Sequence, residues 1–318
     1  MTRWDLLGCG AVAVDDLLYV DRFPEPDTKV PIRSEQRQGG GLTATAMVAA
    51  SRMGASTAFM AVLSDDELSR FSVQELEREG VDCSPILYRE GARPYHSRVV
   101  VDLGSGARTI IYSAAGVTFP GPEDFPEELI GSCRVLFLDQ CGAAAVPRAT
   151  DFARAHGIPV VSDIERIFNP ATQALLERAD HLIIGVGLGR QVTGREDPPA
   201  IAAALARYDR ACCAVTAGAQ GCWYSEHGGP VRHFPAFRVG VVDTTGCGDV
   251  FHGAYAASIA RGEGVVRAIQ IATATAGLKA TQPGGRAGIP DRATVERFLE
   301  AGSRELGIRG SRKLDTGS

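Results

Sequence analysis

Short runs of apolar residues recur along this chain, and they are typical of strands buried inside a sheet. Between them lie longer stretches that predict helices, such as residues 64–79, with Ser64 as the N-cap and Gly80 as the end signal. From residue 134 onward strand and helix alternate, which predicts an α/β fold: a doubly wound, mostly parallel sheet with helices on both faces. The runs that predict strands lie at residues 6–14, 58–63, 135–139, 158–163, 181–184 and 212–216.

A β-hairpin interrupts this α/β pattern. Two strand-like runs, residues 97–103 and 107–112, are joined by the glycine-containing segment 104–106. An extended run at residues 17–23 adds further β structure near the N-terminus. At the other end, residues 303–318 are polar and aperiodic, and we expect a flexible tail there.

Four acidic features follow predicted strands. Asp15, Asp139, Asp163 and the turn at residues 243–249 each come directly after, or near the end of, an apolar run. Ligands of open α/β sheets bind at the carboxyl ends of the strands. We therefore expect these residues to lie along one edge of the sheet and to mark the functional site.

The turn at residues 243–249 carries the most specific chemistry. A helix N-terminus has free backbone N–H groups and attracts phosphate, and Gly246 and Gly248 leave those groups accessible. Asp249 follows in the first turn of a helix predicted at residues 249–261, where a carboxylate can accept a proton from a hydroxyl. An anion cradle beside a base suits phosphoryl transfer to an alcohol. On local chemistry alone, an ordinary βα turn with a capping Asp explains the residues equally well.

Composition and charge narrow the class of protein. The chain has 318 residues, 45% of them hydrophobic and 22% charged, with a net charge of −5, so it has no basic footprint for nucleic acid or anionic membrane. The N-terminus is no signal peptide, and no apolar stretch approaches the roughly 20 residues of a membrane helix. Eight scattered cysteines without a C-x-x-C pair predict reduced thiols. We expect a soluble, cytoplasmic protein.

Three glycine-rich segments invite other interpretations. The chain contains no Gly-Lys pair, which excludes a P-loop. Residues 182–189 resemble part of a dinucleotide fingerprint, but the last position is Arg190 instead of Gly or Ala. Residues 216–221 are able to border a nucleotide phosphate or to form a plain turn. The loop at residues 282–288 suits a monovalent cation, the border of an adenine pocket or a bare connector.

Taken together, the motifs resemble the PfkB/ribokinase family of carbohydrate kinases over nearly the whole chain. The family signature Asp-Thr-x-Gly-Ala-Gly-Asp corresponds to residues 243–249, its Gly-Gly signature to Gly40-Gly41, and its early substrate-binding Asp to Asp15. The resemblance implies a ribokinase-like domain at residues 1–302 with a small β-lid, formed by segments 16–37 and 92–113. It also implies ATP-dependent phosphoryl transfer to a hydroxyl of a small sugar.

The resemblance carries roles onto particular residues. Asp249 is expected to be the general base, and the backbone N–H groups of Gly246, Cys247 and Gly248 to form the anion hole. The expected sugar-binding residues are Asp15, Gly40, Gly41, Thr45 and Lys29. The expected ATP-binding residues are Thr216, Gly218 and Gly221. Candidates for a potassium site are Asp243 and the carbonyls of Thr245, Gln282 and Gly284.

The chain departs from the family pattern in three respects. The Asn-x-x-Glu motif that helps organise Mg²⁺ falls on Gly185 and Leu188, so we expect ATP and water to hold the metal ion. Thr45 stands where an Asn is common, and one sugar hydrogen bond must differ. Cys247 replaces an Ala, and a thiol at a helix N-terminus can have a lowered pKa. One prediction is therefore moderate alkylation of Cys247 that ATP protects against; the other, slightly favoured, is a packed, inert thiol.

Similarities to particular branches of the family indicate the class of substrate. The chain is most similar to the ketohexokinase-like and sulfofructose-kinase-like branches, but Cys141 and Tyr112 replace two residues of the sulfonate-binding set. A neutral ketose or pentose is favoured, then an anionic sugar, then a nucleoside. Cations that could meet a substrate anion are Lys29, Arg33, Arg98 and Arg166.

A different class of function also stays open: a catalytically inactive sugar-binding regulator on the same fold. The missing Asn-x-x-Glu motif favours it, and the intact Asp249 argues against it. Lid strands in this family often pair between subunits, so a homodimer through the lid is a further expectation.

Overall fold

The computed structural model describes residues 2–105, 107–142, 144 and 146–305. Nine strands form one large sheet in the order β15-β14-β13-β12-β11-β10-β1-β4-β6. Neighbours from β13 to β6 are parallel, and β14 and β15 add an antiparallel edge. The bounds are β1 (Trp4–Cys9), β4 (Thr57–Met60), β6 (Val81–Asp82), β10 (Cys133–Asp139), β11 (Val160–Ile164), β12 (His181–Gly185), β13 (Cys212–Thr216), β14 (Cys222–Glu226) and β15 (Arg232–Phe234).

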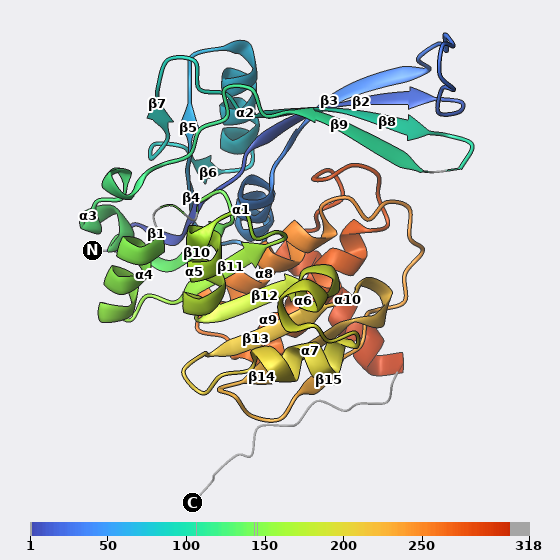
Figure 1. The fold of residues 1–318 in the computed structure, drawn as a ribbon. Coiled ribbons are helices and arrows are strands. Elements are labelled where there is room, and N and C mark those ends of the chain that lie inside the picture. The colour runs from blue at the N-terminus through green and yellow to red at the C-terminus, as the bar shows by residue number, and fades with distance from the viewer. Residues whose placement is uncertain (1, 106, 143, 145, 306–318) are drawn as a thin grey trace, which may run out of the picture.

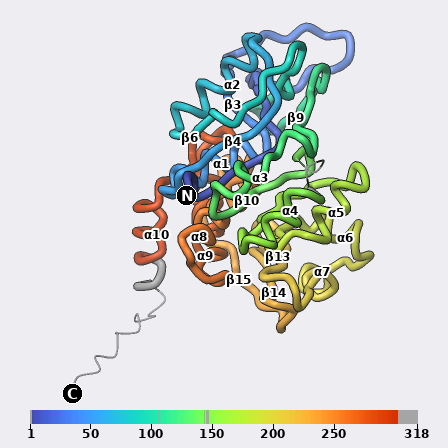
Figure 2. Tube along the Cα trace, turned by 90° about the vertical axis from the view of Figure 1, so that its left-hand side faces the viewer, coloured from blue at the N-terminus to red at the C-terminus, as the bar shows by residue number. Residues whose placement is uncertain are grey.

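Helices cover both faces of this sheet (Figures 1 and 2). On one face α1, α2, α8, α9 and α10 enclose a core that contains Phe137 and Ile183. On the other, α3, α4, α5, α6 and α7 enclose a core that contains Leu136 and Leu182. Because successive strand residues point to opposite faces, both must be apolar, and the strands appear as unbroken apolar runs.

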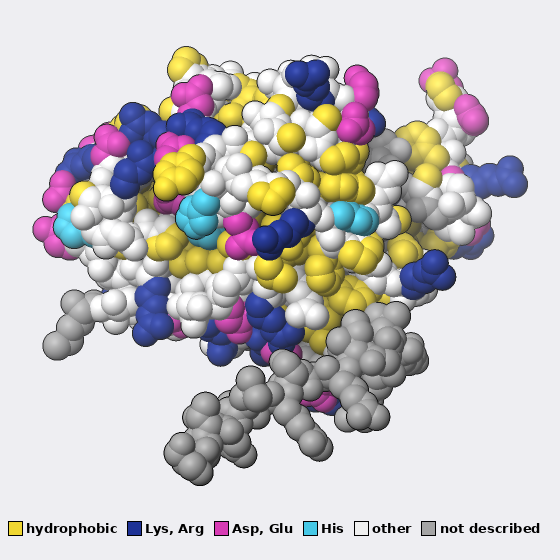
Figure 3. Space-filling view, turned by 90° about the horizontal axis from the view of Figure 1, so that it is seen from below, with side chains coloured by type: hydrophobic (Ala, Val, Ile, Leu, Met, Phe, Trp, Pro, Cys, Tyr) yellow, Lys and Arg dark blue, Asp and Glu magenta, His cyan; other side chains and the backbone are white. Residues whose placement is uncertain are grey.

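The helices begin and end as follows: α1 (Leu42–Arg52), α2 (Glu67–Arg78), α3 (Glu127–Ile130), α4 (Val146–Ala155), α5 (Pro170–Arg178), α6 (Val186–Thr193), α7 (Pro198–Leu205), α8 (Cys247–Ala260), α9 (Val265–Lys279) and α10 (Arg292–Glu305). Short 3₁₀ helices lie at Pro122–Asp124 and Gly218–Gln220. Among the described residues, none of the helices combines the length and apolar character that crossing a bilayer demands. On the face seen from below, acidic and basic side chains are interspersed (Figure 3).

A four-stranded sheet in the order β3-β2-β8-β9 projects beyond the main body and forms the lid (Figure 1). The predicted hairpin corresponds to β8 and β9. On β9 the side chains of Ile110, Ile111 and Tyr112 are all more than half exposed. The lid strands are β2 (Ala13–Val20), β3 (Ser34–Gly40), β8 (Tyr95–Asp102) and β9 (Arg108–Ser113), and a separate pair is formed by β5 (Val62–Leu63) and β7 (Leu87–Tyr88).

The N-terminal apolar run was predicted as one strand, and this was wrong. β1 ends at Cys9, and β2 starts at Ala13 in the other sheet, so the chain leaves the body for the lid within residues 10–12. Asp15 therefore lies inside a lid strand instead of following a strand of the body. Both halves are apolar, so hydrophobicity carried no sign of the change of sheet.

Boundaries of α2, α10 and α8 also differ from the prediction. Asp66, not Ser64, caps α2, because its carboxylate accepts the N–H of Ser69 at 2.7 Å. α10 continues to Glu305, so the predicted tail began too early; residues 306–318 of that tail lie outside the described residues. The helix expected from Asp249 onward begins two residues earlier, at Cys247.

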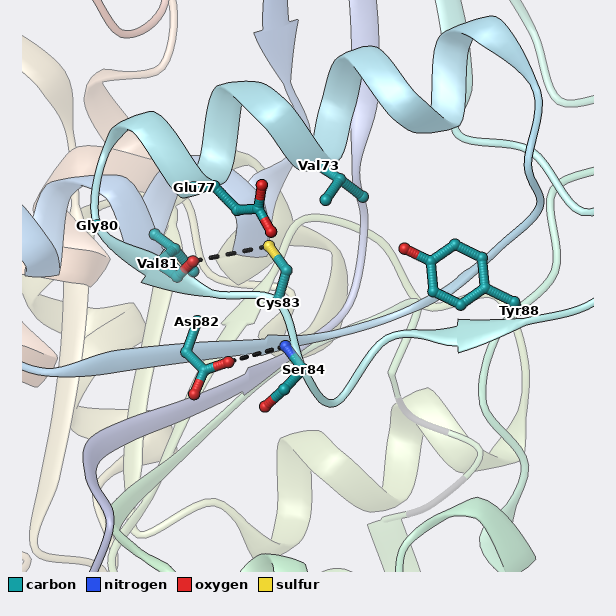
Figure 4. A pocket seen from close by; sticks show the side chains of 8 residues that line it. All are labelled: Val73, Glu77, Gly80, Val81, Asp82, Cys83, Ser84 and Tyr88. Carbon is teal, nitrogen blue, oxygen red and sulfur yellow. Dashed lines mark hydrogen bonds between the residues drawn. The ribbon is translucent and has the colours of Figure 1, made fainter.

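A hollow of about 570 Å³ lies between α2 and the strands β6 and β7. Figure 4 shows its lining: the Cys83 thiol points toward Glu77 and the carbonyl of Val81, 3.7 Å away, and the Asp82 carboxylate accepts from the N–H of Ser84. Burial raises the pKa of Cys83 to about 12. None of the predicted sugar or ATP residues lines this hollow, so we do not assign the functional site to it.

Candidate active site

The turn at residues 243–249 forms an anion cradle at the start of α8. Gly246 is the N-cap with φ 71°, and a side chain there would meet the carbonyl of Gly285 at 2.9 Å, so only glycine fits. The N–H groups of Gly246 and Gly248 form no hydrogen bond with a described residue. The N–H of Cys247, predicted as the third anion donor, instead points to the carbonyl of Thr244 at 3.2 Å. Two of the three predicted donors are free for an anion.

Asp249 stands beside this cradle in the first turn of α8. The residue is half-buried. That burial raises the pKa of Asp249 well above the ordinary carboxyl range, and the charges of Asp163 and Glu165 raise it further. His252 opposes the shift. Burial and the neighbouring negative charges therefore both disfavour the ionised form of the Asp249 carboxyl.

Asp163 is the buried neighbour of Asp249. Only 3% of the residue is exposed, and its Oδ2 forms no hydrogen bond with a described residue. The nearest ring nitrogen is Nδ1 of His252, 3.4 Å from that oxygen. His252 is fixed by two carbonyls: Nδ1 lies 2.7 Å from Gly248 O and Nε2 3.1 Å from Ile183 O. These contacts link α8 to β11 through Asp163 and to β12 through Ile183.

Asp139 pairs in register with Asp163 on the next strand, as predicted for one edge of the sheet. It is fully buried and surrounded by donors: the N–H of Ala11 at 2.7 Å, the hydroxyl of Thr43 at 2.8 Å and the N–H of Cys141 at 2.7 Å. Because these donors come from the segment at residues 10–12, the first turn of α1 and the segment after β10, Asp139 holds these three parts of the chain together.

The predicted sugar residues meet where the lid joins the body. Any side chain at Gly40 would collide with the Asp15 carboxylate, and Gly41 has φ 93°, with the carbonyl of Ala11 where a Cβ would be. Burial raises the pKa of Asp15, whereas its hydrogen bond with Ser97 lowers it. Asp15, Gly40 and Gly41 thus form one compact wall.

Thr45 belongs to this wall but offers its hydroxyl to the protein. Its Oγ1 accepts a hydrogen bond from Nε of Arg286 at 3.1 Å, and Nη2 of the same guanidinium donates to Gly40 O at 2.7 Å. Sequence reasoning missed Arg286; the only signal was a single Arg inside the glycine-dense loop at residues 282–288.

Lys29 does not join the site. It lies in the exposed loop between β2 and β3, at the end of the lid that points away from the body (Figure 1). Its contact with the sugar stays a prediction.

The predicted nucleotide residues occupy the turn after β13. Thr216 ends that strand opposite Gly185, Gly218 has φ 54°, and Gly221 has φ 92°. A side chain at Gly221 would collide with the backbone at Phe234, whereas the space at Gly218 is open. The turn lies at the carboxyl edge of the sheet. Residues 182–189 form β12 and the start of α6, with Gly185 as the N-cap, which explains their glycine pattern.

The candidate potassium site is already rich in cations. The carboxylate of Asp243 accepts from Arg108 at 2.9 Å and from the N–H groups of Thr245 and Gly284 at 2.8 and 2.9 Å. The buried ammonium of Lys279 donates to Asp243 O at 3.0 Å. This ammonium therefore lies beside Asp243, one of the predicted ligands, but contacts its backbone carbonyl and not one of the three carbonyls that were predicted. The N–H of Gln282 donates to Lys279 O at 3.1 Å.

The thiol of Cys247 is packed, not activated. Its Sγ lies 3.5 Å from Ala276 O, and burial raises the pKa of Cys247, which supports the favoured interpretation of a packed, inert thiol over a thiol with a lowered pKa. Desolvation of the thiolate outweighs the helix N-terminus and Lys279. We expect alkylation by iodoacetamide at pH 7 to be about tenfold slower than for a free cysteine. Peptide mass spectrometry measures this, with the unfolded chain as control. Rapid labelling that ATP blocks would contradict the packing argument.

Comparison with known proteins agrees with this geometry. The family model described as pfkB family carbohydrate kinase matches residues 6–292. The chain is 27% identical to the ribokinase of Bacillus subtilis over 296 residues, which covers 91% of this chain and 97% of that protein. It is 25% identical to mouse ketohexokinase over 296 residues, covering 88% and 97%. The structure of Arabidopsis thaliana ribokinase with ribose and ATP superposes with a TM-score of 0.81 at 20% identity, covering 94% of this chain and 99% of that one.

The fold and the site define an α/β kinase with a β-lid, and the match over residues 6–292 decides the family. The chain belongs to the pfkB family of carbohydrate kinases, which are ATP-dependent phosphotransferases that act on an alcohol group. The predicted ribokinase-like fold is confirmed. A dinucleotide-dependent dehydrogenase is excluded. Ribokinases and a ketohexokinase match at similar identity, so the predicted ketohexokinase-like branch is not separated from the others.

Proposed function

We propose that the chain transfers the γ-phosphoryl group of ATP to a hydroxyl of a neutral ketose or pentose, with Asp249 as the general base. The observation that carries the proposal is the juxtaposition at α8: a carboxylate in the first turn beside the free N–H groups of Gly246 and Gly248. The carboxylate takes the hydroxyl proton, and the helix N-terminus stabilises the charge that develops on the phosphoryl group.

The two substrates approach from different sides. Asp15, Gly40 and Gly41 bind sugar hydroxyls at the root of the lid, and Thr216, Gly218 and Gly221 border the nucleotide. An Escherichia coli chain of this fold was crystallised with ATP and Mg²⁺. Among the described residues no group of three or more His, Cys, Asp or Glu side chains could hold a metal ion. This fits a Mg²⁺ ion that enters on the phosphates of ATP and keeps most of its water.

A neutral acceptor is favoured because the candidate cations are occupied or remote. Arg33 is paired with Asp21. Arg98 contacts Asp16 at 3.1 Å. Lys29 and Arg166 are exposed side chains outside the sugar wall, and a buried Cys141 stands where a sulfonate-binding arginine is expected. A substrate anion would therefore find little uncompensated positive charge in the described part of the pocket.

The test compares matched acceptors. We expect kcat/KM for a ketose or pentose to exceed that for the same sugar carrying a phosphate by at least about tenfold, since a buried anion without a partner is costly. Coupled ADP release measures both rates. A preference for the sugar phosphate would contradict the neutral acceptor, and sugar binding without any ADP release would favour the inactive regulator.

The acid limb of the pH profile tests the base. Because the pKa of Asp249 is raised, its ionised fraction is lost as the pH falls through that raised value, and kcat/KM should drop at a higher pH than an ordinary carboxyl would cause. Asp163→Asn removes the neighbouring negative charge, so the pKa of Asp249 falls and the limb moves to lower pH. A limb that stays in place in this variant, or moves to higher pH, would show that the pair does not control it.

A further inference from the structure

Arg286 is a buried guanidinium at the junction of the two signature motifs. It belongs to the loop that follows α9, and only 7% of the residue is exposed. The same loop reaches the phosphate side, where the N–H of Gly284 donates to the Asp243 carboxylate at 2.9 Å. On the sugar side, Nε and Nη2 of Arg286 donate to Thr45 and Gly40. One loop thus connects the anion cradle with the wall of the sugar pocket.

The third nitrogen of this guanidinium is free. Nη1 packs against Gly39, where any side chain would collide with it, and it forms no hydrogen bond with a described residue. Nη1 is not one of the fully buried polar atoms without a partner. It is therefore accessible to solvent, and a small polar molecule can reach it. A guanidinium nitrogen with unused N–H groups in a pocket wall is a ready donor for a ligand oxygen.

Two carboxyls of the site balance the positive charge of Arg286. Its strongest electrostatic partners are the carboxyls of Asp15 and Asp249, one on the sugar side and one at the reacting hydroxyl. Burial lowers the pKa of Arg286 to about 10, so it remains charged at neutral pH. A cation between two carboxylates is already compensated, and a hydroxyl suits it better than a second anion.

We propose that Arg286 is a sugar-binding residue: Nε and Nη2 hold Thr45 and Gly40 in place, and Nη1 donates to an oxygen of the bound sugar. The inference rests on the proposed sugar kinase function and adds a ligand contact that the sequence motifs do not contain. It also accounts for Thr45, whose hydroxyl supports the guanidinium instead of reaching the sugar itself.

The experiment measures sugar binding and nucleotide binding separately. Arg286→Met keeps much of the apolar stem but removes all donors, and we expect sugar affinity to fall about 10- to 100-fold in calorimetric titration. ATP affinity should change less than about threefold, because the nucleotide turn lies elsewhere. Arg286→Lys keeps the charge but not the planar set of donors of the guanidinium. Its sugar affinity should therefore lie between those of the wild type and Arg286→Met.

Arg52→Met is the matched control. Arg52 holds the same loop from the outside, donating to the carbonyls of Arg286 at 3.1 Å and Ile289 at 2.7 Å, and it pairs with Glu79 at 2.7 Å. If Arg286 only supported the loop, Arg52→Met would reproduce the loss of sugar affinity, and the inference would be overturned. Unchanged sugar affinity in both Arg286 variants would overturn it as well. A wild-type chain that phosphorylates no sugar would instead contradict the proposed function.

Discussion

Replacing Asp249 by Asn should lower kcat by about 10²–10⁴ while the affinities for sugar and ATP stay near those of the wild type. Asn keeps the size of the side chain and its place in the first turn of α8, but an amide cannot accept the hydroxyl proton. The anion cradle at Gly246 and Gly248 remains, so the residual rate reflects positioning and charge stabilisation alone. Coupled ADP release gives kcat, and calorimetric titration gives both affinities.

Asp66→Asn serves as the control for this variant. Asp66 also stands at the start of a helix, where its carboxylate caps α2, and Asn is an equally good cap. The control therefore repeats the chemical change at a helix start far from the predicted chemistry. A rate loss of similar size in both variants, or a fully active Asp249→Asn chain, would remove the base assignment.

The largest effect on stability is expected at Asp139. Asp139→Ala leaves the N–H groups of Ala11 and Cys141 and the hydroxyl of Thr43 without their buried acceptor. Unsatisfied buried donors of this kind cost about 1–3 kcal/mol each, and we expect a total loss of about 3–5 kcal/mol in the free energy of unfolding. Urea denaturation measures it through the midpoint and the slope.

Asp180→Ala is the matched comparison for Asp139. Asp180 lies directly before β12, whereas Asp139 ends β10, and its partly buried carboxylate accepts only one strand N–H, that of Val160, at 2.9 Å. Its loss should cost about 1 kcal/mol. An Asp139→Ala chain no less stable than Asp180→Ala would show that the segments that Asp139 joins are held by other contacts.

Much of the fold could be predicted because the strands of the body are buried on both faces. The runs that contain Leu136 and Ile183 are apolar throughout, so their positions were clear from hydrophobicity alone. The lid strand β3 has instead a polar sequence, Ser-Glu-Gln-Arg-Gln-Gly-Gly, and its first four residues are exposed. With neither an apolar run nor an alternation, its pairing with β2 depends on the other strand, and the sequence prediction missed it.

The site was predictable where the backbone carries the chemistry. Gly40, Gly41 and Gly246 must be glycines because a Cβ would collide with neighbouring atoms, so their spacing appears directly in the sequence. Arg286 was not predictable, because its partners Gly40 and Thr45 lie about 240 residues earlier in the chain. The sequence left the state of the Cys247 thiol open for a related reason. Its helix position is local, whereas the burial that raises its pKa comes from α9.

The predicted homodimer through the lid has one supporting feature. Ile110, Ile111 and Tyr112 expose apolar surface on the outer strand β9. Such a row on an edge strand favours pairing with another chain. It stays a prediction, independent of the kinase chemistry.

The central claim is that Asp249 activates a sugar hydroxyl beside the anion cradle of α8. The most direct measurement is ADP release with a panel of neutral ketoses and pentoses, made on the wild type and on Asp249→Asn side by side. The account predicts that the wild type releases ADP only when a suitable sugar is present, and that the variant loses nearly all of this sugar-dependent release. Sugar-dependent release at the wild-type rate in Asp249→Asn would contradict it.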